Sequence, residues 1–174
     1  LEGDFIADKK YHGREDQAVY IYGEDDYDWW RSERNLEPAS GTFGENLTIS
    51  SLSSATFNIG DIIHVGEVTL QVTAPRIPCQ TFSARMEDPQ FIKKFRAAER
   101  PGLYCRVLKT GKVQAGDPVK TEKFKGETVS LVDAYRDHYE PDLQAEAIQR
   151  FLDAPISIRM REKKEEHLKK VRTT

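Results

Sequence analysis

Cysteine is scarce in this chain, because its 174 residues include only Cys79 and Cys105. Two cysteines are too few for a disulfide framework or for a four-cysteine zinc site. The sequence therefore indicates a reducing compartment. In such a compartment an accessible thiol can serve as a soft metal ligand or as a nucleophile.

Long apolar runs and an excess of basic charge are also missing. No stretch approaches the roughly 18 consecutive apolar residues of a membrane helix, and the first residues lack a signal-peptide pattern. Acidic residues number 29 and basic residues 26, so the formal charge is −3. We therefore expect a soluble, cytoplasmic protein with no membrane contact and no general nucleic-acid binding. A local cationic pocket for a small anion is compatible with this charge.

The spacing of apolar residues predicts one strand-rich body with a small helical tail. Val68, Leu70 and Val72 alternate with polar residues after a tight turn at Gly66, which is typical of a hairpin with one apolar face. We expect strands over 18–22, 46–50, 62–65, 68–74, 103–109, 113–115 and 119–124. Helices are expected over 25–34, from 88 to about 100, and in the tail over 128–139, 142–153 and 157–172.

Cys79 is the first candidate for chemistry. It ends the run PRIPC at residues 75–79, where two prolines terminate a strand because each removes a backbone donor. A side chain just past a strand end emerges into a cleft, and a guanidinium such as that of Arg76 stabilises a thiolate. The alternative is an inert core cysteine, the commoner fate of a lone thiol. We interpret Cys105 in that way, because alternation places it on an apolar strand face.

The opening loop carries the second group of candidates. Lys9, Lys10 and Arg14 would bind an anion if this polar, turn-rich run folds over a cleft, and His12 would hydrogen-bond a ligand there. The alternative is ordinary surface charge with a solvated histidine.

The run TFGEN at residues 42–46 is the third candidate. Gly44 allows a backbone turn that larger residues cannot make, and Asn46 after Glu45 offers both a donor and an acceptor to a heterocycle. The alternative is a structural turn. The charged stretch 162–170 has helical spacing and is interpreted as a solvated helix face. A phosphate-binding P-loop, a dinucleotide fingerprint and a zinc-protease helix are all absent.

These runs, in this order and separation, resemble the MOSC domain, named after the C-terminal part of molybdenum-cofactor sulfurases. The resemblance covers nearly the whole chain and rests on an opening signature within residues 3–19, FGENL at 43–47, RIPC at 76–79 and GLYCRVL at 102–108. The tail resembles the three-helix "3-alpha" module of the YiiM-like branch. Two departures concern the His12 loop only: Arg14 replaces a usual glycine, and Glu15 replaces a frequent proline.

The resemblance implies a mainly β, barrel-like fold with short helices, divided into a MOSC domain over residues 1–126 and a three-helix module over 127–174. The chain opens at Leu1 without a methionine, and we expect a first barrel strand to precede it.

The same resemblance implies a molybdenum cofactor, with no pyridoxal phosphate. Cys79 would bind its molybdenum or carry persulfide sulfur. Lys9, Lys10, Arg14 and Arg76 would meet the cofactor's phosphate. Glu45, Asn46 and His12 would lie near the pterin or the substrate.

The leading hypothesis from this resemblance is a reductase. Molybdenum, reduced by a separate electron-donor protein, would take the oxygen of an N-hydroxylated base such as 6-hydroxylaminopurine, or of an amidoxime, and the amine would leave. A carrier of persulfide sulfur or cofactor without turnover stays open as the alternative. A third interpretation is a binding module whose tail docks a partner, which a Cys79 sealed in an apolar core would favour.

Overall fold

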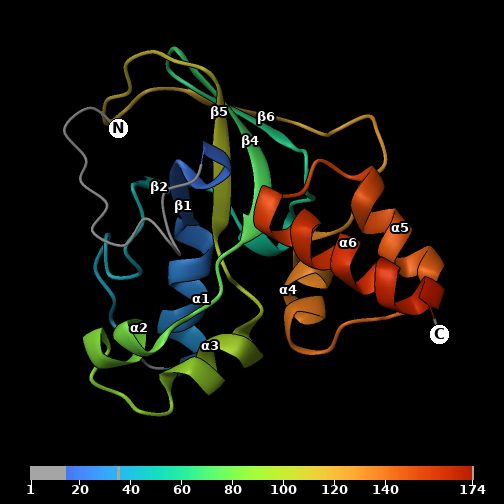
Figure 1. Cartoon of the computed structure of the whole chain (residues 1–174). Coiled ribbons are helices and arrows are strands. Elements are labelled where there is room, and N and C mark those ends of the chain that lie inside the picture. The colour runs from blue at the N-terminus through green and yellow to red at the C-terminus, as the bar shows by residue number, and fades with distance from the viewer. Residues whose placement is uncertain (1–14, 35, 174) are drawn as a thin grey trace.

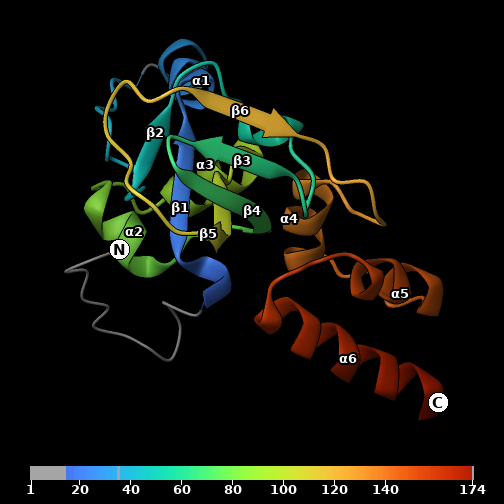
Figure 2. The ribbon, with the colours of Figure 1, turned by 90° about the horizontal axis from the view of Figure 1, so that it is seen from above.

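The computed structural model describes residues 15–34 and 36–173, apart from the side chain of Thr173 (Figure 1). Six strands form one sheet in the order β2-β1-β5-β4-β3-β6. Their bounds are β1 (Val19–Gly23), β2 (Leu47–Ile49), β3 (Ile62–Val65), β4 (Val68–Pro75), β5 (Leu103–Lys109) and β6 (Val119–Glu122). Strands β1 and β2 are parallel, and the other neighbours are antiparallel. The sheet curls into a half-barrel, which confirms the expected barrel-like fold (Figure 2).

The hairpin of β3 and β4 matches its sequence pattern. Val65 pairs with Val68 across Gly66, whose φ of 54° suits the tight turn. Val68, Leu70 and Val72 are all buried, as their alternation predicts. The expected strand over 113–115 is wrong, because this segment is irregular. The amide of Gln114 donates to Asp117 Oδ2 at 2.9 Å and not to a neighbouring strand.

The helices of the body are α1 (Glu24–Arg34), α2 (Gln80–Arg85) and α3 (Phe91–Ala98), with short 3-10 helices η1 (Glu15–Gln17) and η2 (Ser54–Thr56). The expected helix over 88–100 is shorter at both ends. Asp88 accepts from Gln90 N at 2.8 Å before the helix begins, and Glu99 ends it with a left-handed φ of 51°. The sequence did not predict α2, whose six residues are too few for a periodic pattern.

Two apolar cores lie on the sheet. One is built mainly of aliphatic side chains from the strands and includes residues of the tail such as Leu131, Ala134 and Phe151. The other, which we call the aromatic cluster, lies where α1, α2 and α3 pack at one end of the sheet (Figure 1). Its fully or nearly fully buried members are Tyr20, Tyr22, Tyr27, Trp30, Phe43, Phe82, Phe91, Phe95, Ala98 and Tyr135.

The tail consists of α4 (Leu131–Tyr139), α5 (Ala145–Asp153) and α6 (Ile158–Thr173). Helix α4 starts at Ser130, whose side chain accepts from Asp133 N at 2.9 Å. Helix α6 begins beside the sheet and runs away from it with α5 (Figure 2). The predicted domain boundary at 126–127 stays a prediction. No helix in the described ranges is long and apolar enough to cross a membrane.

Candidate functional site

Cys79 lies where the sequence placed it, just past the end of β4. The strand ends at Pro75, and Cys79 is the N-cap of α2. Its carbonyl accepts from Phe82 N at 3.0 Å and from Ser83 N at 3.2 Å, which fixes the residue at the start of the helix. Cys79 is exposed. The binding-module interpretation expected a sealed thiol, and this condition is not met.

Cys79 lines a cavity of about 610 Å³, within the usual range for small-molecule sites. The strand ends and the segment after β4 form one wall, and α4 and the first turns of α6 form the other. Its described lining consists of Gln17, Ala74, Pro75, Ile77, Pro78, Cys79, Thr81, Tyr104, Ala134, Asp137, His138, Ser157, Arg159, Met160, Lys163 and Lys164.

The helical wall of this cavity carries charged side chains. Lys164 is 1% exposed, its Nζ donates to Asp137 Oδ1 at 2.6 Å, and it lies 4.2 Å from the centre of the Phe151 ring. The interpretation of 162–170 as a solvated face is therefore wrong for Lys164. Arg159 and Lys163 of α6 line the same wall.

His138 of α4 belongs to the same wall. Burial lowers its pKa below the ordinary 6.5, and the nearby charges of Lys163 and Arg159 lower it further, while Asp137 acts in the opposite direction. The sequence did not single out His138 or Arg159 as site residues, and it interpreted Lys163 as part of a solvated helix face. Helical spacing places Arg159 and Lys163 on one face of α6. No local signal in the sequence indicates that this face and α4 line a cavity with Cys79.

Arg76 is not among the described residues that line this cavity. Its guanidinium donates to the Phe43 carbonyl and lies 4.9 Å and 4.5 Å from the ring centres of Tyr20 and Phe82. Arg76 therefore ties the cysteine segment to the loop over residues 42–46. Its predicted contact with a cofactor phosphate stays a prediction.

Glu45 and Asn46 also have partners within the protein. Glu45 Oε1 accepts from the Tyr27 hydroxyl and from Gly41 N at 2.8 Å. Asn46 exchanges two hydrogen bonds with the backbone of Tyr20, both 2.8 Å long. These contacts support the structural-turn alternative for this loop. A pterin or substrate contact of either residue stays a prediction.

The remaining predicted residues differ in outcome. Lys9, Lys10, His12 and Arg14 lie outside the described residues. Cys105 is 0% exposed, and burial raises the pKa of its thiol, which confirms it as a core residue. Among the side chains that the structure describes, no group of three or more His, Cys, Asp and Glu could hold a metal ion.

A MOSC domain family model matches residues 8–120, which is more than half of the chain, and the chain belongs to this family. Among its relatives, YiiM of Escherichia coli is 32% identical over 126 residues, which cover 69% of this chain and 55% of that protein. A protein of Gibberella moniliformis named "Reductase" is 38% identical over 112 residues, which cover 62% of this chain and 20% of that protein.

The solved structure of YiiM from Geobacillus stearothermophilus has a TM-score of 0.80 at 26% identity, with coverage of 88% of this chain and 80% of that one. Similarity in both sequence and structure confirms the YiiM-like branch.

Proposed function

We propose that this chain binds a molybdenum cofactor through the Cys79 thiolate and reduces N-hydroxylated bases or amidoximes. The observation that carries the proposal is the exposed Cys79 side chain on the wall of a cavity of about 610 Å³. Two comparisons support it. MOSC domains are associated with the molybdenum cofactor, and one relative is named a reductase.

The described residues fit such a group. A thiolate is a soft donor and suits a metal that dithiolene sulfur already binds. Ile77, Tyr104 and Met160 give the cavity apolar surface for a flat ring, while Arg159 and Lys163 supply positive charge for a phosphate. When bound, the cofactor supplies two-electron redox chemistry with oxygen-atom transfer at the metal.

The residues of the chain itself would hold and orient the reactants. Pro75 and Pro78 restrict the backbone of the cysteine segment, residues 75–79, and the Arg76 contact with Phe43 anchors it. The reaction consumes two electrons and two protons: R–NH–OH becomes R–NH₂ and water. A separate electron-donor protein would supply the electrons.

Metal analysis tests the proposal. We expect wild-type protein from a cofactor-producing host to contain close to one molybdenum per chain, and Cys79→Ala to contain almost none. Cys105→Ala is the matched control, because it removes the buried thiol and should keep the metal. The loaded wild type should also reduce 6-hydroxylaminopurine with a chemical electron donor. Equal, metal-free preparations of wild type and Cys79→Ala would count against the proposal.

The alternative is a carrier of persulfide sulfur or cofactor, which the same exposed thiol supports. A persulfide is one sulfur atom added to a cysteine. Mass spectrometry of fresh, molybdenum-free protein separates the two functions. A mass increase of one sulfur atom on Cys79 favours the carrier, whereas substrate turnover by loaded protein favours the reductase.

A further inference from the structure

We propose that Thr73 of β4 is the positioning residue of the Cys79 cavity. Its hydroxyl and carbonyl groups join the elements that form the cavity walls, and so fix the space in which a substrate meets the thiolate. This role deepens the proposed function and rests on it, because the substrate that the walls would hold is the one proposed above.

Thr73 departs from the alternating pattern of its strand. Thr69 and Gln71 occupy the preceding polar positions of β4 and are partly exposed, but Thr73 is 0% exposed. The register against β5 shifts between Val72 and Ala74, which leaves Thr73 as an extra residue in a bulge. Bulges redirect side chains and are frequent beside active sites. The burial and the bulge together indicate a local role for Thr73 that strand pairing does not require.

Thr73 contacts three other elements through its two oxygen atoms. Its Oγ1 lies 2.5 Å from the Asp16 carbonyl oxygen of η1 and 3.0 Å from the Tyr104 carbonyl oxygen of β5, so the hydroxyl donates to these carbonyls. The Thr73 carbonyl accepts from Ser157 N, just before α6, at 3.0 Å. The next amide, that of Ile158, donates to the carboxylate of Asp16 and closes a ring of hydrogen bonds. We call these five residues the Thr73 junction.

The Thr73 junction reaches several walls of the Cys79 cavity. Thr73 is not among the described lining residues, but Tyr104 and Ser157 both line the cavity. Gln17 of η1 and Ala74, the residue after Thr73, line it as well. One buried side chain therefore holds η1, β5 and the start of α6 against β4. A displacement at Thr73 would move these walls together.

Burial makes the hydrogen bonds of the junction difficult to replace. Asp16 is 3% exposed and Ser157 is 2% exposed. A buried carbonyl group that loses its donor has no water to turn to, so such bonds keep their partners more strictly than exposed ones. Thr73→Val keeps the shape of the side chain and exchanges the hydroxyl for a methyl group. It therefore removes the donor and little else.

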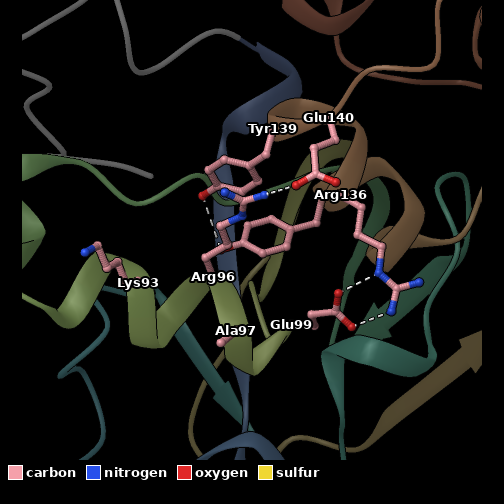
Figure 3. A pocket seen from close by; sticks show the side chains of 8 residues that line it. Lys93, Arg96, Ala97, Glu99, Arg136, Tyr139 and Glu140 are labelled. Carbon is pink, nitrogen blue, oxygen red and sulfur yellow. Dashed lines mark hydrogen bonds and ion pairs between the residues drawn. The ribbon is translucent and has the colours of Figure 1, made fainter.

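A second contact between the tail and the body differs in kind. At the cavity of about 430 Å³ between α3 and α4, ion pairs join the two helices (Figure 3). Arg136 binds Glu99 through two hydrogen bonds of 2.5 and 2.6 Å, and Arg96 binds Glu140. The Arg136 side chain is 59% exposed, and exposed ion pairs contribute little to stability. Arg136→Met therefore offers a control that cuts a contact between tail and body away from Cys79.

Amide hydrogen exchange of the metal-free protein tests the junction. We compare wild type with Thr73→Val, with Thr73→Ser, which keeps the hydroxyl, and with Ile63→Val, which removes a buried methyl group from β3. In Thr73→Val, the protection of the Ser157 and Ile158 amides relative to the core amides of β3 should fall about tenfold, which corresponds to one lost hydrogen bond. Thr73→Ser should retain this relative protection. Ile63→Val controls for a general loss of stability and should retain it too.

The reactivity of Cys79 shows whether the effect reaches the cavity. An aromatic disulfide reagent is bulky and iodoacetamide is small, so the ratio of their rates reports the space before the thiol and cancels changes in the thiolate fraction. Because the start of α6 is released, Thr73→Val should raise this ratio. Thr73→Ser, Ile63→Val and Arg136→Met should keep the wild-type ratio. In molybdenum-loaded protein, Thr73→Val should raise KM for 6-hydroxylaminopurine more than it lowers kcat.

The ratio of rates decides the outcome. A wild-type ratio in Thr73→Val would overturn the role of Thr73, and so would an equal rise in Ile63→Val, because Thr73 would then act only through overall stability. If Thr73→Val does not fold, Asp16→Ala replaces it, since that variant removes the other link to α6. A wild-type ratio in Asp16→Ala would overturn the role in the same way. A raised ratio in protein that never binds molybdenum would refute only the proposed function.

Discussion

The five residues of the cysteine segment, 75–79, border two regions of opposite character. On one side, the Arg76 guanidinium enters the aromatic cluster and bonds to the Phe43 carbonyl. On the other, Cys79 is exposed at a cavity of about 610 Å³. Only two residues of sequence separate a group that the protein uses for its own packing from one that is exposed at a cavity.

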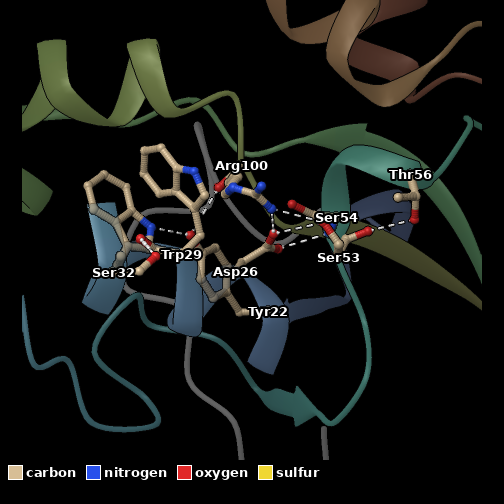
Figure 4. Close-up of polar contacts among 9 residues, drawn as sticks. Tyr22, Asp26, Trp29, Ser32, Ser53, Ser54, Thr56 and Arg100 are labelled. Atoms are coloured by element: carbon tan, nitrogen blue, oxygen red, sulfur yellow. Dashed lines mark hydrogen bonds and ion pairs between the residues drawn. The ribbon is translucent and has the colours of Figure 1, made fainter. Parts of the chain in front are cut away.

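Asp26 illustrates the first region. This carboxylate is 0% exposed and accepts from Ser54 N and from Arg100 Nη1, both at 2.9 Å, and from Ser53 Oγ at 3.3 Å (Figure 4). It joins α1 to the loop before η2 and to the segment after α3. We therefore expect replacement of a buried polar residue near the cluster to destabilise the fold, and replacement of the exposed Cys79 side chain to have little effect on it.

The largest expected effect is that of Asp26→Ala. Removal of one partner of a buried ion pair leaves Arg100 without its carboxylate, and we expect the free energy of unfolding to fall by about 3–5 kcal/mol. Denaturant unfolding measures it. Asp28→Ala on the same helix, whose ion pair with Arg31 is exposed, is the control and should cost less than about 1 kcal/mol. Equal losses in the two variants would contradict the comparison.

Arg76→Met should have the next largest effect. It removes the hydrogen bond to Phe43 O and the contacts with the Tyr20 and Phe82 rings, so we expect a loss of about 1–3 kcal/mol. Arg85→Met, which removes a hydrogen bond from exposed Arg85 to Gly41 O, should change stability by less than about 1 kcal/mol. If Arg76→Met instead loses molybdenum at unchanged stability, the residue belongs to the cofactor site.

Cys79→Ala should change stability by less than about 0.5 kcal/mol, because an exposed side chain has few contacts to lose. An aromatic disulfide reagent should modify one thiol in the folded wild type and almost none in Cys79→Ala. Burial and a raised pKa protect the Cys105 thiol, which should react only after unfolding. Two reactive thiols in the folded chain would show that the buried core opens readily.

The sequence predicted those features that depend on neighbouring residues. Alternation specified the β3–β4 hairpin and the burial of Cys105, and the two prolines placed Cys79 past a strand end. Local spacing did not reveal α2, since a six-residue helix contains less than two turns. The irregular 113–115 segment has strand-like residues, but its backbone bonds to Asp117 within a turn.

The second wall of the cavity could not be predicted from local patterns. Arg159 and Lys163 look like ordinary residues of a charged helix. They line the Cys79 cavity because Ser157 and Ile158 hold the start of α6 against β4 and Asp16. Likewise, Arg76 beside a cysteine suggests a partner for the thiolate. Its actual partner, Phe43, lies 33 residues earlier in the chain.

The smallest expected effect sharpens the description of the cavity wall. His138 should titrate below its ordinary pKa of 6.5, first because of burial and then because of Lys163 and Arg159. Since the folded state disfavours protonated His138, its contribution to stability should be lost as the pH falls through 6.5. Lys163→Met should raise the pKa and weaken this pH dependence, and Lys169→Met should change both less. NMR titration of the His138 ring measures the shift. An unchanged pKa in Lys163→Met would mean that the charge of Lys163 on α6 does not act on His138 of α4, and that burial lowers the pKa of His138 without it.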